Sequence, residues 1–185
     1  MTHAHREQLS LQVERATRRL RERLAGLTDD EYLWEPVAHC WTVRRRDTAS
    51  SPQPEGRGAW VFDNAAEEPS PAPFTTIAWR LMHLVDVIGG YQRVLAGTAV
   101  TDDWLEVAPT AAAGVALWEE QASAFAQALA QEDDESLQRP VRVPWWPQDT
   151  PRWRVLSNVA MEMIHHGAEI ALVRDLYLRR DELRR

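Results

Sequence analysis

The sequence predicts an all-α fold, a four-helix bundle, on three observations. Four segments repeat apolar residues at spacings of three and four, the period of a buried helix face. Start and stop signals for helices flank these segments. The composition over 185 residues, 44% apolar and 26% charged, is typical of a soluble globular chain. Because this length suits one domain, we expect residues 1–185 to form a single helical-bundle domain.

Each of the four expected helices shows its own apolar seam. The first seam runs from Leu9 to Leu27, the third from Ala111 to Leu129, and the fourth from Val155 to Tyr177. The second segment, roughly 74–96, is apolar almost all round, as expected of a well-buried helix. A seam that repeats about every 3.5 residues is what antiparallel bundle packing needs.

Helix boundaries are marked by residues that favour caps. Prolines precede the second segment, and Gly97 follows it, where a C-terminal glycine is expected. Thr110 is placed to cap the third helix, and Thr150-Pro151 to open the fourth.

The connection between the first two helices, residues 28–73, is too long to be structureless inside a compact domain. Two of its pieces, "CWTVR" at 40–44 and "GAWVFD" at 58–63, alternate apolar and polar residues. They are able to pair as a small β-hairpin whose tip is 47–57.

Tryptophans gather in the connecting segments, at Trp41 and Trp60 in the first and at Trp145 and Trp146 near the fourth helix. Aromatic-rich loops at the end of a bundle can form the wall of a pocket, and they can equally plug the core. With Trp79 of the second helix, these residues are our candidates for a pocket wall.

Charge and composition exclude several classes of protein. The net charge of −7 and the pI near 5.4 argue against nucleic-acid binding, which needs a basic face. No apolar run approaches the ~20 residues that span a bilayer, and the N-terminus lacks a signal core. We therefore expect a cytoplasmic protein without membrane contact.

The single cysteine, Cys40, excludes an intramolecular disulfide, and it is better interpreted as a packed thiol than as a nucleophile.

The fourth helix carries ionisable groups where its pattern calls for apolar ones. Glu162 and His166 are one turn apart and occupy seam positions, whereas His165 lies ~100° round the helix, at an edge or in solvent. His83 lies among apolar residues of the second helix, and facing helices approach to ~8–10 Å. Two histidines and one carboxylate are an established ligand set for a divalent metal.

A structural polar network explains the same residues. Glu162 would then pair with a buried arginine such as Arg80, and His166 would donate to a backbone carbonyl. Glu169 either orients a ligand from behind or pairs with Arg80 or Arg174, and we favour the ion pair. Asp86, three residues after His83, likewise either orients a ligand or forms an ion pair. A metalloprotease is disfavoured because the H-E-x-x-H order is absent.

The segments "TTIAWRLMH" (75–83) and "HHGAEIALVRDLY" (165–177), together with "LTDDEYLWEPVAHCWTVRR" (27–45), resemble the DinB-like (YfiT-like) superfamily, with the actinobacterial branch nearest. The resemblance implies a four-helix bundle with a divalent-metal site of three histidines. His83 matches the first ligand and His166 the last. Glu162 stands at the middle position, where the resemblance implies histidine. It either gives an oxygen-richer, less zinc-selective shell for a metal of the Zn, Ni or Mn type, or marks a member that has lost tight metal binding.

Relatives in this superfamily include mycothiol-dependent enzymes, so the resemblance implies a thiol-dependent S-transferase or isomerase. A low-molecular-weight thiol would bind the metal beside a small electrophile, with catalytic residues other than the ligands unassigned. The alternative is a non-catalytic bundle that binds a small ligand or a partner chain. Bundles of this kind often associate, so a homodimer is also an expectation.

Overall fold

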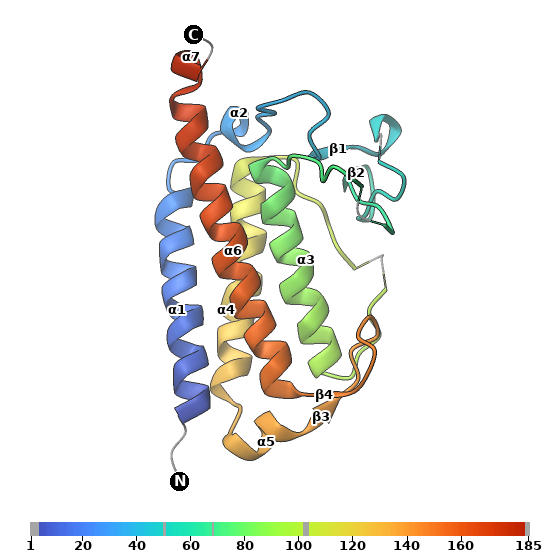
Figure 1. Ribbon diagram of the computed structural model, residues 1–185, viewed down its shortest axis with the longest axis vertical. Helices are drawn as coiled ribbons and strands as arrows, with labels where there is room; N and C mark the ends of the chain where they lie inside the picture. Colours follow the sequence, from blue (N-terminus) through green and yellow to red (C-terminus); the bar gives the residue numbers. More distant parts are fainter. Residues whose placement is uncertain (1–3, 50, 68, 102–103, 184–185) are drawn as a thin grey trace.

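The computed structural model describes residues 4–49, 51–67, 69–101 and 104–183. Its four long helices are α1 (Ala4–Leu24), α3 (Ile77–Leu95), α4 (Ala111–Ala130) and α6 (Arg152–Leu178). They pack side by side as a bundle (Figure 1), in which α6 contacts α1 and α3, and α4 contacts the same two helices from the other side. The predicted all-α fold class, a four-helix bundle, is confirmed.

Short elements cover the two ends of the bundle. They are the helices α2 (Asp29–Tyr32), α5 (Asp134–Gln138) and α7 (Arg180–Leu183), a 3-10 helix η1 (Arg46–Thr48), and the strands β1 (Val43–Arg45), β2 (Trp60–Phe62), β3 (Pro140–Val141) and β4 (Thr150–Pro151). The two strands of each pair run antiparallel.

The predicted hairpin in the first connection is present. Val43 pairs with Phe62 and Arg45 with Trp60, across β1 and β2. Backbone hydrogen bonds then tie this unit to the start of α3, because Trp41 donates to Phe74 (2.8 Å) and accepts from Thr76 (3.0 Å). The hairpin is thereby fixed over the N-terminal end of α3 (Figure 1).

Thr110, Gly97 and Pro151 lie at helix ends as suggested, and Thr76 is a further cap that the sequence analysis missed. Thr76 caps α3 by accepting from the Trp79 N–H, and Thr110 caps α4 by accepting from the Ala113 N–H (3.3 Å). Gly97 has a φ of 69° just after α3, a left-handed conformation that glycine adopts without steric cost. Pro151 directly precedes α6.

One expectation about direction was wrong. Figure 1 shows that α3 and α4 run the same way, so the bundle is not antiparallel throughout. The connection between α3 and α4 makes this possible, because its described parts, 96–101 and 104–110, run back along the outside of the bundle. About 15 extended residues reach about 50 Å, whereas a 20-residue helix is about 30 Å long. This return brings Trp104 beside α3.

The seam residues form a continuous core. Trp118, Phe125, Leu81 and Ile170 are all fully buried, and burial of such side chains contributes about 1.5–3 kcal/mol each relative to exposure. Tyr177, which the pattern placed on the buried side, is only half-buried and packs edge-on against Trp34. None of the helices in the described part of the chain is both long and apolar enough to cross a membrane.

Candidate metal centre

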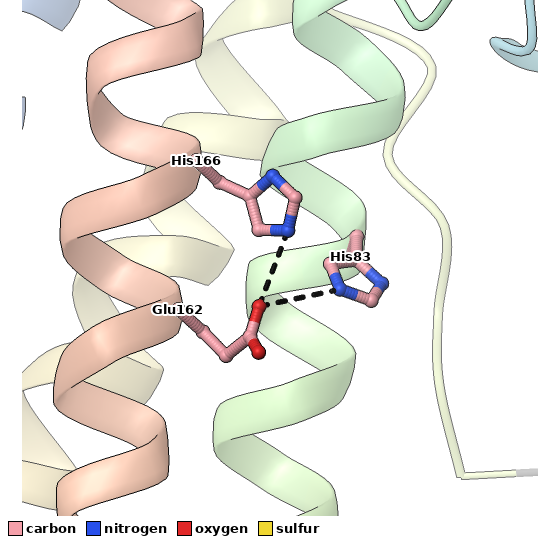
Figure 2. Close-up of side chains that lie close together, drawn as sticks. All are labelled: His83, Glu162 and His166. Carbon is pink, nitrogen blue, oxygen red and sulfur yellow. Dashed lines mark ion pairs between the residues drawn. The ribbon is translucent and has the colours of Figure 1, made fainter. Parts of the chain in front are cut away.

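Three side chains from two helices converge inside the bundle. In Figure 2 one carboxylate oxygen of Glu162 faces the imidazoles of both His83, from α3, and His166, from α6. Glu162 Oε2 lies 3.3 Å from His166 Nε2 and 3.9 Å from His83 Nε2. One candidate ligand atom from each residue lies within 4.8 Å of the others.

The convergence follows from helix geometry and packing. Glu162 and His166 are one turn apart, so their side chains stack on one face of α6. This face meets α3, where Trp79 stacks on the His83 ring with 4.9 Å between centroids. The side chain of His166 is 11% exposed, whereas those of Glu162 and His83 are 21% and 28% exposed. The cluster is therefore sheltered but open on one side.

Glu169 fills both roles that the sequence left open. Its Oε2 lies 2.7 Å from Nδ1 of His166 and 3.2 Å from Nε of Arg80. Arg80 also donates to the backbone carbonyl of Glu169 (3.4 Å). Arg174 instead pairs with Glu31, at 3.1 Å. Glu169 thus orients His166 from behind while it neutralises a buried arginine.

The alternative pairing of Glu162 with Arg80 is not observed, because Arg80 is engaged by Glu169. Within the described chain, the ion-pair partners of Glu162 are His83 and His166. His165 is 61% exposed and is not one of the three residues of the cluster, as expected. Its ring stacks on that of His166, and its Nε2 lies 3.4 Å from Glu169 Oε1.

The protonation states of His83 and Glu162 favour cation binding, whereas the raised pKa of His166 means that a metal must displace a proton there. Burial, with a further contribution from His166, lowers the pKa of His83 to about 4, so His83 is neutral at pH 7 and offers a lone pair. The hydrogen bond with His166 lowers the pKa of Glu162 despite its burial, which keeps the carboxylate ionised. Burial alone would lower the pKa of His166, but its hydrogen bonds to Glu162 and Glu169 outweigh burial and raise it.

The donor set fits a divalent metal ion. Imidazole nitrogen and carboxylate oxygen bind zinc at about 2.0–2.2 Å, which separates neighbouring ligand atoms of a tetrahedral site by about 3.4 Å. The observed distances of 3.3 Å and 3.9 Å from Glu162 bracket this value. The bond from Nδ1 of His166 to Glu169 leaves its Nε2 directed at the cluster, the arrangement that ligating histidines adopt.

A pocket of about 330 Å³ opens beside the cluster. Its wall on α3 follows one helix face through His83, Asp86 and Tyr91, and its wall on α6 holds Asn158 and Glu162. Asp86, expected near the site, therefore lies in the pocket wall one turn after His83.

Of the five tryptophans proposed for the wall, Trp145 lines this pocket. Trp79 lies behind His83, and its Nε1 donates to the Asp63 carbonyl (2.6 Å). Trp41 packs against Trp79, and Trp60 lies in β2 beside a separate surface hollow. Trp146 packs on Tyr91. These four are not among the residues lining the pocket, because the hairpin and α3 hold them against the core.

Sequence reasoning missed two aromatic residues of the wall, Trp104 and Tyr91. Trp104 packs so closely on Gly89 that a Cβ there would lie 2.2 Å from its ring. The pair of glycines in α3 is the signal that could have indicated a bulky neighbour. Cys40 is buried away from the pocket, its thiol donates to the Val37 carbonyl, and burial raises its pKa.

Comparisons with known proteins agree with this architecture. The family model described as the DinB superfamily matches residues 12–170. Among solved structures, the crystal structure of a conserved protein from Enterococcus faecalis is similar, with 16% sequence identity and a TM-score of 0.55. That match covers 92% of this chain and 95% of the other, and at this identity it shows the fold alone. No curated protein matches the chain.

Proposed function

Because the chain belongs to the DinB superfamily, we propose that it is a divalent-metal-binding protein whose ligands are His83, Glu162 and His166. The superfamily includes metal-binding proteins. The observation that carries the proposal is the convergence of these three side chains from α3 and α6, with donor atoms within 4.8 Å of one another. Two nitrogens and one carboxylate oxygen suit zinc, nickel or manganese.

The pocket beside the cluster supports a reaction with a small molecule. His83 and Glu162 belong to the cluster and also line the pocket, so a ligand in the pocket has direct access to the metal site. A bound divalent metal would supply Lewis acidity, lowering the pKa of a coordinated thiol. Glu169 holds Nδ1 of His166, which keeps Nε2 turned to the site.

The reaction class that fits best is transfer or isomerisation that depends on a low-molecular-weight thiol of the mycothiol type. The sulfur of the thiol would form a bond to a small electrophile held in the pocket. His83, Glu162 and His166 would hold the metal, and the pocket walls would orient the electrophile. This class rests on the resemblance of 75–83 and 165–177 to thiol-dependent members of the superfamily.

Zinc titration of chelator-treated protein tests the metal site. We expect one zinc ion per chain, and His83→Ala or His166→Ala should weaken binding at least about 100-fold, since each removes a ligand. His165→Ala is the matched control, because it removes a neighbouring histidine that lies outside the cluster. Full zinc affinity in both ligand variants would show that the site lies elsewhere.

Activity is tested separately, with zinc-loaded protein, mycothiol and a chromogenic aryl halide. Transfer forms a carbon–sulfur bond and releases halide and a proton, so halide release reports the reaction. We expect it to require both zinc and the thiol.

A non-catalytic role is favoured by one feature: both ring nitrogens of His166 already have carboxylate partners, so the network is satisfied without metal. Absence of zinc binding would support that role.

A further inference from the structure

The charged residues in the wall of the pocket beside the cluster are all acidic. They are Glu55, Asp86 and Glu162. Although the chain has 21 basic residues, none of the described residues that line the pocket is an arginine. A cleft lined by one sign of charge concentrates ligands of the opposite sign.

The apolar part of the wall is aromatic. Tyr91, Trp104 and Trp145 line the pocket, and Trp145 is 51% exposed and so accessible from solvent. Trp104 already holds a cation on its ring, because the guanidinium of Arg93 lies 5.0 Å from its centroid. Aromatic faces of this kind attract ammonium groups.

Tyr91 has a hydrogen bond left to donate. Its phenol is 5% exposed and accepts hydrogen bonds from Trp145 Nε1 (3.3 Å) and Asn158 Nδ2 (3.2 Å). Both partners act as donors, so they occupy the two lone pairs of the phenol oxygen. The O–H hydrogen has no acceptor among the described residues. Because Tyr91 lines the pocket, a ligand oxygen there can accept this hydrogen.

Taking this pocket as the binding site of the proposed function, we infer that it receives a small cationic molecule, an amine that also carries an oxygen acceptor. Glu55 and Asp86 face its ammonium group, the aromatic walls cover its carbon skeleton, and Tyr91 donates to its oxygen. With a divalent ion held at His83, Glu162 and His166, the three carboxylates of the wall still exceed the charge of the ion by one, and no arginine lines the pocket to receive an anion. Anionic electrophiles and carboxylate-rich thiols are therefore disfavoured.

Three probes of nearly equal shape, each with one benzylic hydroxyl as the oxygen acceptor, test the charge preference: 2-amino-1-phenylethanol, 1-phenylethane-1,2-diol and mandelate. Each is titrated by NMR into unmodified protein, once in chelator and once with zinc, so that coordination of the amine to metal is separated from binding by the walls. In chelator we expect the amine to bind about fivefold more tightly than the uncharged alcohol, the diol, and mandelate to bind most weakly. Mandelate binding as tightly as the amine, or no binding by any probe, would overturn the inference.

Two variants test whether Asp86 causes the preference for the amine. Asp86→Asn should reduce the affinity for the amine about threefold or more while that for the alcohol stays the same. Glu120→Gln, an exposed carboxylate on α4, is the matched control and should change neither. Equal affinities in Asp86→Asn and unmodified protein would contradict the assignment of Asp86. If Asp86→Asn fails to fold, the ranking of the probes on unmodified protein still decides.

The test of the preference for the amine is independent of the test of the metal site. Zinc binding with no preference for the amine would remove the cationic substrate and leave the metal centre. Preference for the amine without zinc binding would leave a cation-binding pocket in a metal-free bundle.

Discussion

Nδ1 of His166 lies 2.7 Å from Oε2 of Glu169, one turn further along α6. This bond fixes the ring so that Nε2 points at Glu162, and Arg80 holds the carboxylate in place from α3. The ligand geometry at His166 therefore depends on two residues that do not themselves belong to the His83–Glu162–His166 cluster.

Glu169→Gln should weaken zinc binding by about 10- to 100-fold, because the neutral amide neither orients nor polarises the imidazole as a carboxylate does. The measurement is competition with a chromophoric chelator. Glu120→Gln serves as the control for loss of one carboxylate. Unchanged zinc affinity in Glu169→Gln would mean that the bond to His166 has no influence on the metal.

Replacement of Glu162 tests why a carboxylate stands where the superfamily resemblance implies histidine. Glu162→His would supply a third imidazole, so we expect zinc affinity to be retained or increased. Glu162→Gln keeps the size but removes the charge, and should reduce affinity by about tenfold or more. Isothermal titration calorimetry on the two variants gives the comparison. A Glu162→Gln protein that binds zinc normally would exclude Glu162 as a ligand.

Adjacent glycines in α3 should respond differently to alanine. A Cβ at Gly89 would meet the ring of Trp104 at 2.2 Å, whereas a Cβ at Gly90 would come no closer than 4.0 Å to Trp145. Gly90→Ala should stabilise the protein by about 0.5–1 kcal/mol, because alanine favours the helix.

Gly89→Ala gains the same helix propensity but must displace Trp104, so we expect a net loss of about 1–3 kcal/mol. Chemical denaturation followed by circular dichroism measures both free energies of unfolding. Equal effects of the two substitutions would show that Trp104 does not pack on Gly89.

The ion pair of Glu132 and Arg152 should make stability depend on pH. Glu132 is 8% exposed, and its contacts with Arg152 (Nε to Oε1, 3.1 Å) outweigh burial and lower its pKa. Because the folded-state pKa lies below the unfolded value of about 4.3, the stabilisation is complete above that value. It is lost as the pH falls through the folded-state pKa.

Glu132→Gln should therefore cost about 1–3 kcal/mol at pH 7, and its difference from the unmodified protein should shrink below about pH 4. Denaturant titrations at several pH values measure this difference. Glu135→Gln, whose side chain is 85% exposed, is the control and should be neutral. A difference independent of pH would show that ionisation of Glu132 is not the cause.

Much of the fold was predictable because helix periodicity is local. The seams located the four long helices, and the caps at Thr110 and Gly97 located their ends within a few residues. The hairpin was predictable from alternation in 40–44 and 58–63. The parallel course of α3 and α4 was not, because a connection of about 15 residues permits either direction.

The sequence by itself determined that Glu162 and His166 share one face of a buried helix, since a spacing of four fixes this in any α-helix. Only the tertiary structure decided what meets that face. Packing of α3 on α6 brings His83 to Glu162 and Arg80 to Glu169, and the return of the chain before α4 places Trp104 in the wall of the pocket. These contacts join residues far apart in the chain, and their choice depends on the burial of whole helix faces.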